Sequence, residues 1–498
     1  MTFSYVSDPS ASSNIGIVAF CLLLSWWLGT SFLAWYRLRH VPGPWFAGLS
    51  YIWNGWIAYS GTQHHVFVAL DQKYGSLVRI GPQVLLTSDV ELVKRMSATK
   101  SSYGKSSWVD GVRFNPYHET MFAVRDPRQH DRAKARVAPA YSGRDTPNLE
   151  GAVDQQVNNL ISLIRRRYLS EPASGVFRTL PLLNVLSYFT LDVISKVALG
   201  TEFGCCASDS DPYRFYEGLD EHMPLMALTS DVPWIRAIMY STTFLKYFGP
   251  RETDSHGIGP LMNQDQTEKT DMLSSFKVHG LSEGNAQSET LFMFVAGSDT
   301  TASAIRVTLF YLMSSPRVYR KLKEEIRDTI REGKASSPIT AAQARELPYL
   351  QAVIYEGLRM RPVTTGQQAK EVPAGGDTIN GYFIPGGTSI AINFSAILGS
   401  KALFGQDADV FRPERFIGLS PSDLAEMRRN VEMNFGHGRW MCAGKPLAFM
   451  ELQKVYFELL RAFDFQLTEP LSPMQSESYA LFRDFGLKVR ATVAEDME

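Results

Sequence analysis

One cysteine lies in a glycine-rich loop near the C-terminal end of the chain. The loop spans residues 434–446 and contains Cys442, and a helical pattern over 447–460 follows it. Glycines let backbone N–H groups approach a sulfur atom, and the start of a helix is positive, so both features stabilise a thiolate. Such a thiolate is either a nucleophile, with His437 as the one nearby base, or an axial metal ligand, which needs no base. A buried structural cysteine is the third interpretation.

A second chemical signal is an acid beside an alcohol within an apolar helical stretch. The stretch spans Glu289–Met313, with Ser288 as the expected N-cap, and contains Asp299 and Thr300. An acid is costly to bury in such a helix, so it needs partners or a chemical role. Gly297, nearby, permits close approach of a flat or bulky group to the backbone. A reactive centre and a solvated helix kink both fit this pattern.

Composition limits the class of protein that must position these residues. The chain has 498 residues, of which 45% are apolar and 20% charged, and its formal net charge is −1. This charge argues against a strongly basic nucleic-acid-binding protein. Four cysteines without a C-x-x-C pair argue against a disulfide framework and against a four-cysteine metal site.

The N-terminal region contains a long uncharged segment, Asn14–Tyr36, which is long enough to cross a bilayer as a helix. Arg37 and Arg39 follow it, and the positive-inside rule then places the rest of the chain in the cytosol. A stiff Pro42–Pro44 segment comes next. We therefore expect a membrane anchor over residues 1–40, with a transmembrane helix at about 14–36, and one domain over 41–498.

The domain is expected to be mainly α with small β-sheets. Val78–Ile80 and Val84–Leu86 predict a β-hairpin, and a second hairpin is predicted around Pro385–Gly387 from strands at 382–384 and 388–392. A helix is predicted from Pro316 to the residue before Gly333, because its apolar residues repeat on one face.

Four short motifs, in their order along the chain, resemble those of the cytochrome P-450 family, the haem-thiolate monooxygenases. They resemble in particular the fungal microsomal members in the pisatin demethylase-like branch of secondary metabolism. The cysteine loop matches Phe-x-x-Gly-x-Arg-x-Cys-x-Gly except at one position. The other motifs are Ala/Gly-Gly-x-Asp/Glu-Thr at Ala296–Thr300, Glu-x-x-Arg at Glu356–Arg359 and Pro-Glu-Arg-Phe at Pro413–Phe416. The resemblance extends over nearly the whole chain.

Two departures concern the family's contacts to the haem propionates. Trp440 stands where the cysteine loop usually has arginine, and Arg439 lies one place earlier. The family's Trp-x-x-x-Arg pattern occurs here only as His130 and Lys134. These departures put the usual propionate partners in doubt.

The resemblance implies a haem b between a long central helix and the cysteine loop, with a role for each matched residue. Cys442 is expected to be the axial iron ligand, while Asp299 and Thr300 deliver protons during oxygen activation. Glu356, Arg359 and Arg415 are expected to form a structural ion-pair group. The expected cofactor-binding residues are Phe435, Gly438, Arg439, Lys134, His130 and Gly297.

The resemblance also implies partners, because the chain contains no dinucleotide or flavin motif. Electrons from NADPH would come through a separate cytochrome P-450 reductase in the endoplasmic reticulum membrane. Basic residues over 121–140 are candidates for its docking face. The substrate would be a lipophilic small molecule, oxidised with O2 in a pocket walled by residues 102–120, 223–248, 292–296, 362–368 and 479–482. The sequence identifies neither the substrate nor any need for cytochrome b5.

Three alternatives are less well supported. Gly280–Gly284 matches the Gly-x-Ser-x-Gly elbow of hydrolases, but the preceding residues make a poor buried strand. A haem-thiolate isomerase or dehydratase would not need the Asp299–Thr300 pair. Neither would a non-catalytic haem carrier.

Overall fold

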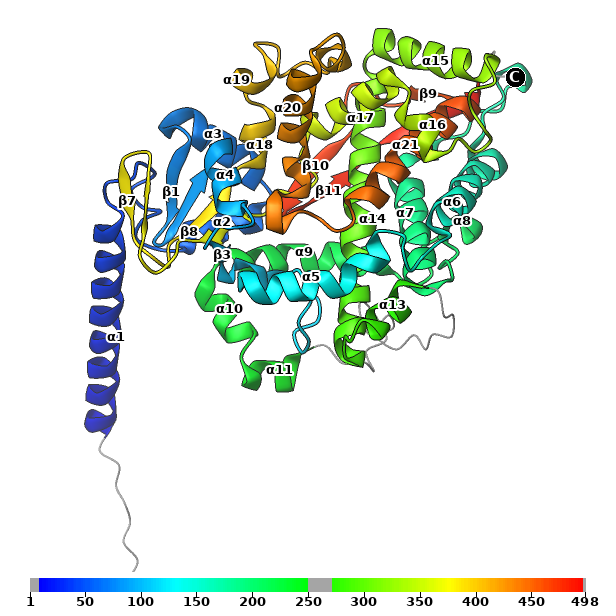
Figure 1. Ribbon diagram of the computed structural model, residues 1–498. Coiled ribbons are helices and arrows are strands. Elements are labelled where there is room, and N and C mark those ends of the chain that lie inside the picture. The colour runs from blue at the N-terminus through cyan, green and yellow to red at the C-terminus, as the bar shows by residue number, and fades with distance from the viewer. Residues whose placement is uncertain (1–8, 250–270, 496–498) are drawn as a thin grey trace, which may run out of the picture.

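The computed structural model describes residues 9–249 and 271–495 (Figure 1). Helices dominate, and the strands form four small sheets, as the sequence predicts. The largest apolar core lies among the helices, while two smaller clusters lie on either side of the five-stranded sheet.

The longest helix, α14 (Glu283–Met313), runs through the middle of the molecule (Figure 1). It begins six residues before the expected start, because Ser282 rather than Ser288 is its N-cap. Ser288 is instead buried inside the helix. Helix α14 packs against α7 (Leu182–Leu199) and α21 (Lys445–Ala462). The Tyr456 hydroxyl of α21 donates to the Ala304 carbonyl of α14 at 3.0 Å, and this hydrogen bond joins the two helices.

A side chain of helix α7 lies directly beside Gly297. A Cβ atom at this position would lie 2.8 Å from Cδ1 of Ile194 on α7. Glycine at this position therefore allows α14 and α7 to pack closely, and the expectation that Gly297 belongs to the cofactor site stays a prediction. The sequence could not reveal this, because the helix pattern alone does not say which neighbour meets each face.

The main sheet has the strand order β1-β2-β8-β5-β3. Strands β1 (Leu77–Gly81) and β2 (Val84–Thr87) form the first predicted hairpin, which is confirmed. Its other strands are β8 (Ser389–Ile392), β5 (Lys370–Glu371) and β3 (Gly104–Lys105).

The second predicted hairpin is wrong. Strand β7 (Tyr382–Ile384) pairs with β6 (Asp377–Ile379), and β8 pairs with β2 in parallel and with β5. The difference follows from burial. The apolar strand β8 is almost wholly buried and suits a central position, whereas β7 is largely accessible.

The C-terminal strands form two further sheets. Strands β10 (Gln475–Tyr479) and β11 (Leu481–Phe485) make a hairpin beside α14, with Ala480 at its turn in a positive-φ conformation. The three-stranded sheet contains β4 (Leu180–Pro181), β12 (Lys488–Val493) and β9 (Phe463–Leu467).

The other helices surround this frame. Helix α15 (Pro316–Arg331) confirms the predicted apolar stripe, and Val318, Leu322 and Ile326 are buried. Residues 279–282 link two helices, so a helix rather than a strand leads into Ser282, which rules out the hydrolase elbow. The remaining α-helices are α2 (Ile52–Ser60), α3 (Gln63–Tyr74), α4 (Val90–Ser97), α5 (Pro127–Tyr141), α6 (Leu149–Leu163), α8 (Cys205–Ser208), α9 (Phe215–Asp231), α10 (Pro233–Met239), α11 (Thr242–Phe248), α13 (Met272–Val278), α16 (Ala341–Arg345), α17 (Pro348–Met360), α18 (Phe394–Leu398), α19 (Lys401–Phe404) and α20 (Pro421–Val431).

Helix α1 (Pro9–Arg37) projects from the body below the main sheet (Figure 1). The buried Arg79 side chain of β1 donates to the carbonyl oxygens of Ala34 and Trp35, each at 2.9 Å. A guanidinium group at the end of a helix satisfies its free carbonyls and its negative pole. Among the described residues, α7 alone is long and apolar enough to cross a membrane, and 83% of it is buried inside the structure.

Candidate active site

The Cys442 loop is shaped by hydrogen bonds and two glycines. The Cys442 N–H donates to the Phe435 carbonyl at 2.6 Å, and the Phe435 ring packs on Phe449 of α21. Gly436 and Gly438 have φ values of 75° and 55°. A Cβ at Gly438 would also collide with a backbone carbonyl of α4. Gly438 therefore lets the loop pack against α4.

The Cys442 side chain is exposed, yet burial among protein atoms raises the pKa of its thiol. The backbone N–H groups of Gly444 and Lys445, at the start of α21, and the charge of Lys134 oppose the rise in pKa. They therefore stabilise the thiolate form, as the glycine-rich loop predicts.

One face of α14 is partly accessible in the middle of the helix, where the other faces are buried. Phe292, Ala296 and Thr300 recur at every fourth position and are only partly buried, whereas Ser298, Asp299 and Thr301 are buried. The Thr300 hydroxyl donates to the Ala296 carbonyl at 2.7 Å. Thr300 therefore borders an internal space, while Asp299 points to another side of α14.

Asp299 contacts Arg306, two turns further along α14, at 3.2 Å. Burial raises the pKa of Asp299 to about 6, and the Arg306 charge opposes that rise. A carboxyl group with a pKa near neutrality can hold and release a proton. The structure thus places the acid and the alcohol on adjacent positions of one helix without a direct contact between them.

Two lysines that the sequence analysis did not single out lie opposite each other in the main sheet. Lys105 of β3 pairs in register with Lys370 of β5, and both are buried. The Lys105 ammonium donates to the Phe122 carbonyl at 2.6 Å. Both ammonium groups lie over the Trp440 indole, at 5.0 and 4.4 Å from its centroid. Neither lysine has an ion-pair partner within the described ranges 9–249 and 271–495.

This pair of cations fits the two carboxylates of a haem. Burial lowers the pKa of Lys105 to about 7, and burial together with the Lys105 charge lowers that of Lys370 well below its usual value. Like charges placed directly opposite each other are destabilising unless an anion lies between them. A cavity of about 50 Å³ is lined by both lysines and Trp440. The residues present therefore fit the propionate end of the cofactor.

Two further polar groups at this end have no hydrogen-bond partner among the described residues. They are the buried Nδ1 atom of His130 and the Nε1–H group of Trp440. Burial and the surrounding charges of Lys105, Lys134, Lys370 and Arg439 lower the pKa of His130 to about 2, so it is neutral. Both groups are available to a ligand at this end.

Arg439 and Lys134 are engaged elsewhere. The Arg439 side chain contacts Asp131 at 3.0 Å and donates to the Ser101 carbonyl at 3.1 Å. The Lys134 ammonium donates to the carbonyls of Arg439 and Met441 at 3.0 and 2.7 Å. Both side chains thus fasten the cysteine loop to its surroundings. The expectation that they also contact the cofactor stays a prediction.

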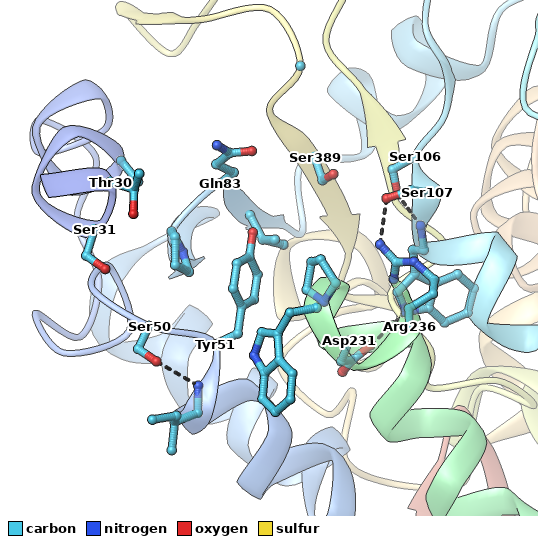
Figure 2. Close-up of a pocket in the computed structure, with 18 of the residues that line it drawn as sticks. Thr30, Ser31, Ser50, Tyr51, Gln83, Ser106, Ser107, Asp231, Arg236 and Ser389 are labelled. Atoms are coloured by element: carbon cyan, nitrogen blue, oxygen red, sulfur yellow. Dashed lines mark hydrogen bonds between the residues drawn. The ribbon is translucent and has the colours of Figure 1, made fainter. Parts of the chain in front are cut away.

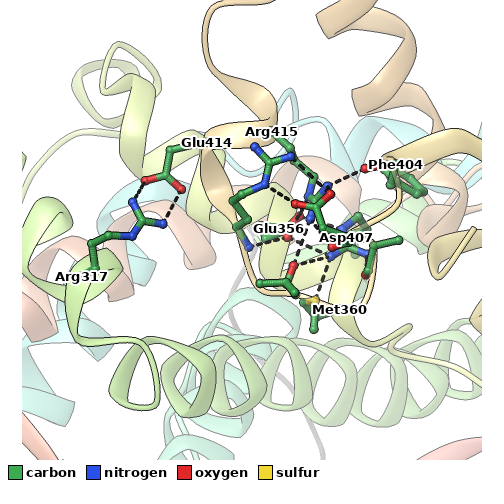
Figure 3. Close-up of polar contacts among 11 residues, drawn as sticks. Arg317, Glu356, Met360, Phe404, Asp407, Glu414 and Arg415 are labelled. Atoms are coloured by element: carbon green, nitrogen blue, oxygen red, sulfur yellow. Dashed lines mark hydrogen bonds and ion pairs between the residues drawn. The ribbon is translucent and has the colours of Figure 1, made fainter. Parts of the chain in front are cut away.

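The expected ion-pair group is assembled completely. Glu356 receives N–H groups from Arg359 at 2.7 and 2.8 Å and from Arg415 at 2.9 Å (Figure 3). All three side chains are almost fully buried. Arg415 also contacts Asp407 at 3.3 Å, which joins α17 to the loop that precedes the Pro-Glu-Arg-Phe segment.

The segments predicted to wall a substrate pocket converge around Trp108. Its indole N–H donates to Asp231 of α9 at 2.7 Å. A Cβ at Gly366 would lie 2.7 Å from the Trp108 ring and 3.0 Å from Ala480. Phe122 stacks on Phe292 of α14 with ring centroids 4.9 Å apart. Residues distant in sequence are thereby brought to one region beside the central helix.

A cavity of about 760 Å³ leads from this region toward α1. Figure 2 shows Thr30 and Ser31 of α1 on one side and Ser107, Asp231 and Arg236 on the other. Trp26, Trp27 and Trp108 also line it. The cavity therefore joins the N-terminal helix to the predicted pocket walls.

Sequence reasoning missed Lys105, Lys370 and Arg306. The available signal was a lysine inside each of two short strand-forming segments, and an arginine within an otherwise apolar helix. Such residues need buried partners.

Comparisons with known proteins agree with this arrangement. The family described as Cytochrome P-450 matches residues 42–484. The chain is 47% identical over 473 residues to Cytochrome P-450 monooxygenase aba1 of Botryotinia fuckeliana, with 93% of each chain covered. It is 40% identical over 514 residues to Cytochrome P-450 monooxygenase ABA1 of Pyricularia oryzae, covering 99% of this chain and all of the relative. Pisatin demethylase of Fusarium vanettenii is 28% identical and covers 91% of this chain and 88% of its own.

Proposed function

The chain belongs to the cytochrome P-450 family of monooxygenases, and from that premise we propose that it is a membrane-anchored enzyme of fungal secondary metabolism whose haem b is ligated by Cys442. The observation that supports Cys442 as the iron ligand is the environment of its thiol. The thiol is exposed, and the backbone N–H groups of Gly444 and Lys445 at the start of α21 stabilise its thiolate form. A thiolate-ligated haem uses two electrons and two protons to place one atom of O2 in a substrate and release the other as water.

The chain's own residues would hold and serve this cofactor. Lys105 and Lys370 bind its two carboxylates, and His130 and Trp440 line the same end. Phe435 packs beside the ligand loop. Asp299 and Thr300 move protons to the reacting oxygen, with water completing the path between their side chains. Glu356, Arg359 and Arg415 hold the segments behind the cysteine loop in place.

Residues 1–40 form the membrane anchor and residues 41–498 the catalytic domain in this proposal. Apolar side chains on several sides of α1 are exposed, including Ile17, Leu22 and Trp26 at 58%, 67% and 68%. Exposed apolar surface of this extent is stable in lipid rather than in water. With Arg37 and Arg39 after the span, the catalytic domain faces the cytosol at the endoplasmic reticulum.

Electrons would arrive from NADPH through a separate reductase. Arg128, Arg132 and Arg136 lie four residues apart on α5 and are all exposed. None of them has an ion-pair partner in the part of the chain that the structure describes. Because Lys134 of the same helix is bonded to the cysteine loop, a reductase with an acidic face would dock close to the ligand side of the haem.

The substrate would be a lipophilic small molecule. Trp108, Phe292 and Ala480 lie in the segments proposed to wall the pocket, and the larger cavity, which Trp108 lines, opens beside the proposed anchor. Substrates dissolved in the membrane would therefore have a short path to the active site.

The test is oxygen consumption by the full-length protein in membranes with candidate metabolites. The proposal requires product formation that depends on NADPH, reductase and O2. Product formation without NADPH would indicate an isomerase or dehydratase. A haem-loaded protein that forms no product with any metabolite of its own biosynthetic pathway would indicate a carrier.

A further inference from the structure

Asp299 belongs to a chain of four charged side chains that crosses from the central helix to the C-terminal hairpin, and three of them are buried while Arg361 is partly buried. Arg306 lies 3.2 Å from Asp299 and 3.3 Å from Asp484 of β11. Asp484 in turn contacts Arg361, which follows α17, at 2.7 Å. Two acids and two bases therefore alternate along the chain, and their formal charges cancel.

The two carboxylates are held very unequally. Asp484 receives hydrogen bonds from both terminal nitrogens of Arg361, at 2.7 and 2.8 Å, from Ser476 at 2.6 Å and from Arg306 at 3.3 Å. Asp299 receives one hydrogen bond, from Arg306. These contacts fix Asp484, whereas Asp299 loses a single contact if its side chain turns.

Because Arg306 contacts both Asp299 and Asp484, a turn of the Asp299 side chain costs less free energy than it would in an isolated ion pair. When Asp299 turns from Arg306 toward the side of Thr300, Arg306 remains paired with Asp484. A buried guanidinium is therefore never left without a carboxylate, which is the most costly state of such a pair. The adjacent positions of Asp299 and Thr300 on α14 make a turn of this kind, or an intervening water, necessary for proton transfer between them.

We propose that Arg306 is a positioning residue that holds Asp299 ready to pass a proton toward Thr300, and that Asp484, fixed by Arg361, sets how strongly Arg306 holds it. This inference rests on the proposed monooxygenase function. In the transfer, the Asp299 carboxyl group gives one proton to the reacting oxygen through Thr300 and water. It then takes one proton back from solvent on the side of Asp220, which is partly exposed on α9.

The charges around Asp299 determine the sign of each expected change. Arg306 lowers the pKa of Asp299, whereas Asp484 and Asp220 raise it. Tyr216 of α9 also lies close enough for its pKa to be affected by Asp299. Removing the Arg306 charge must therefore favour the protonated form of Asp299, and removing the charge of Asp484 or Asp220 must favour the carboxylate.

The experiment is an infrared titration of the full-length, haem-loaded protein. The carboxyl C=O stretch of Asp299 is assigned by its loss in Asp299→Asn and is followed against pH. We expect Arg306→Gln to raise the midpoint by about one pH unit or more, and Asp484→Asn to lower it. Arg306→Lys, which keeps the charge, should give a midpoint close to that of the native protein.

Two further variants keep the proposal open to refutation. Asp220→Asn changes a partly exposed residue that contacts Arg483 at 3.4 Å, and it should lower the midpoint even if the Arg306 and Asp484 variants do not fold. Arg317→Gln, which removes the partner of Glu414 at the surface, is the matched control and should not move it. An unchanged midpoint in Asp220→Asn and in folded Arg306→Gln, or shifts of the same sign in Arg306→Gln and Asp484→Asn, would overturn the proposal.

A carbon-monoxide difference spectrum of the same samples separates the two proposals. A thiolate-type spectrum with no midpoint shifts contradicts the role of Arg306 alone. Absence of a thiolate-type spectrum from the native protein contradicts the proposed function itself.

Discussion

Lys105 and Lys370 stand directly opposite each other in strands β3 and β5, buried with both ammonium groups over the indole ring of Trp440. Two buried positive charges at this separation destabilise the fold on their own, because burial penalises each and they repel each other. A dianionic cofactor edge removes both penalties. In the proposed function, the lysine pair takes the place of the arginine that the family's cysteine loop usually has at the position of Trp440.

The first prediction concerns this pair. Lys105→Met or Lys370→Met should speed transfer of haem from the protein to excess apomyoglobin by about tenfold or more, since a hydrogen bond to a charged group contributes about 1.5–3 kcal/mol. Lys94→Met, which removes a surface lysine paired with Glu91, is the control. Equal transfer rates in all three variants and the native protein would contradict the assignment.

The second prediction concerns the buried ion-pair group. Glu356→Ala leaves Arg359 and Arg415 buried without their shared carboxylate, and Arg359→Ala leaves Glu356 with one arginine fewer. Breaking a buried pair from one side costs about 3–5 kcal/mol, so both variants should accumulate without haem. The ratio of haem to protein absorbance measures this. Arg317→Ala, at a surface pair with Glu414, should load haem normally, and full loading of either core variant would refute the prediction.

The third prediction concerns the central helix. Thr300 borders the internal space and Thr301 is buried, so Thr300→Ala should divert electrons from product to peroxide while Thr301→Ala should not. Peroxide released per NADPH consumed, with a substrate that supports turnover, measures the diversion. Unchanged coupling in Thr300→Ala would mean that Thr301 or another group delivers the proton.

The fourth prediction concerns the close approach of α14 and α7. Gly297→Ala should lower the free energy of unfolding by about 1–3 kcal/mol, because the added methyl group meets Ile194 in a tightly packed contact. Ile194→Ala in the same chain should recover part of the loss, as a double-mutant cycle of urea unfolding can measure. Additive changes in the free energy of unfolding would show that the two residues do not compete for the same space.

The sequence was sufficient for features that depend on local pattern. The first hairpin, the apolar stripe of α15 and the mainly helical class follow from periodicity and turn residues, and the structure has all three. The motif residues Glu356, Arg359 and Arg415 are also brought together.

Features that depend on tertiary neighbours could not be read in the same way. The strands on either side of Pro385–Gly387 join different sheets because burial, not the turn, decides their partners. Lys105 and Lys370 are far apart in the chain and acquire meaning only when β3 pairs with β5. Likewise, the contacts of Arg439 with Asp131 and of Gly297 with Ile194 depend on which elements pack nearby.

The most direct test of the account is a reduced carbon-monoxide difference spectrum of the full-length protein and of Cys442→Ala. The account predicts a strongly red-shifted Soret band in the native protein that is absent from the variant. Folded, haem-loaded native protein without that band, or a variant that retains it, would contradict Cys442 as the iron ligand.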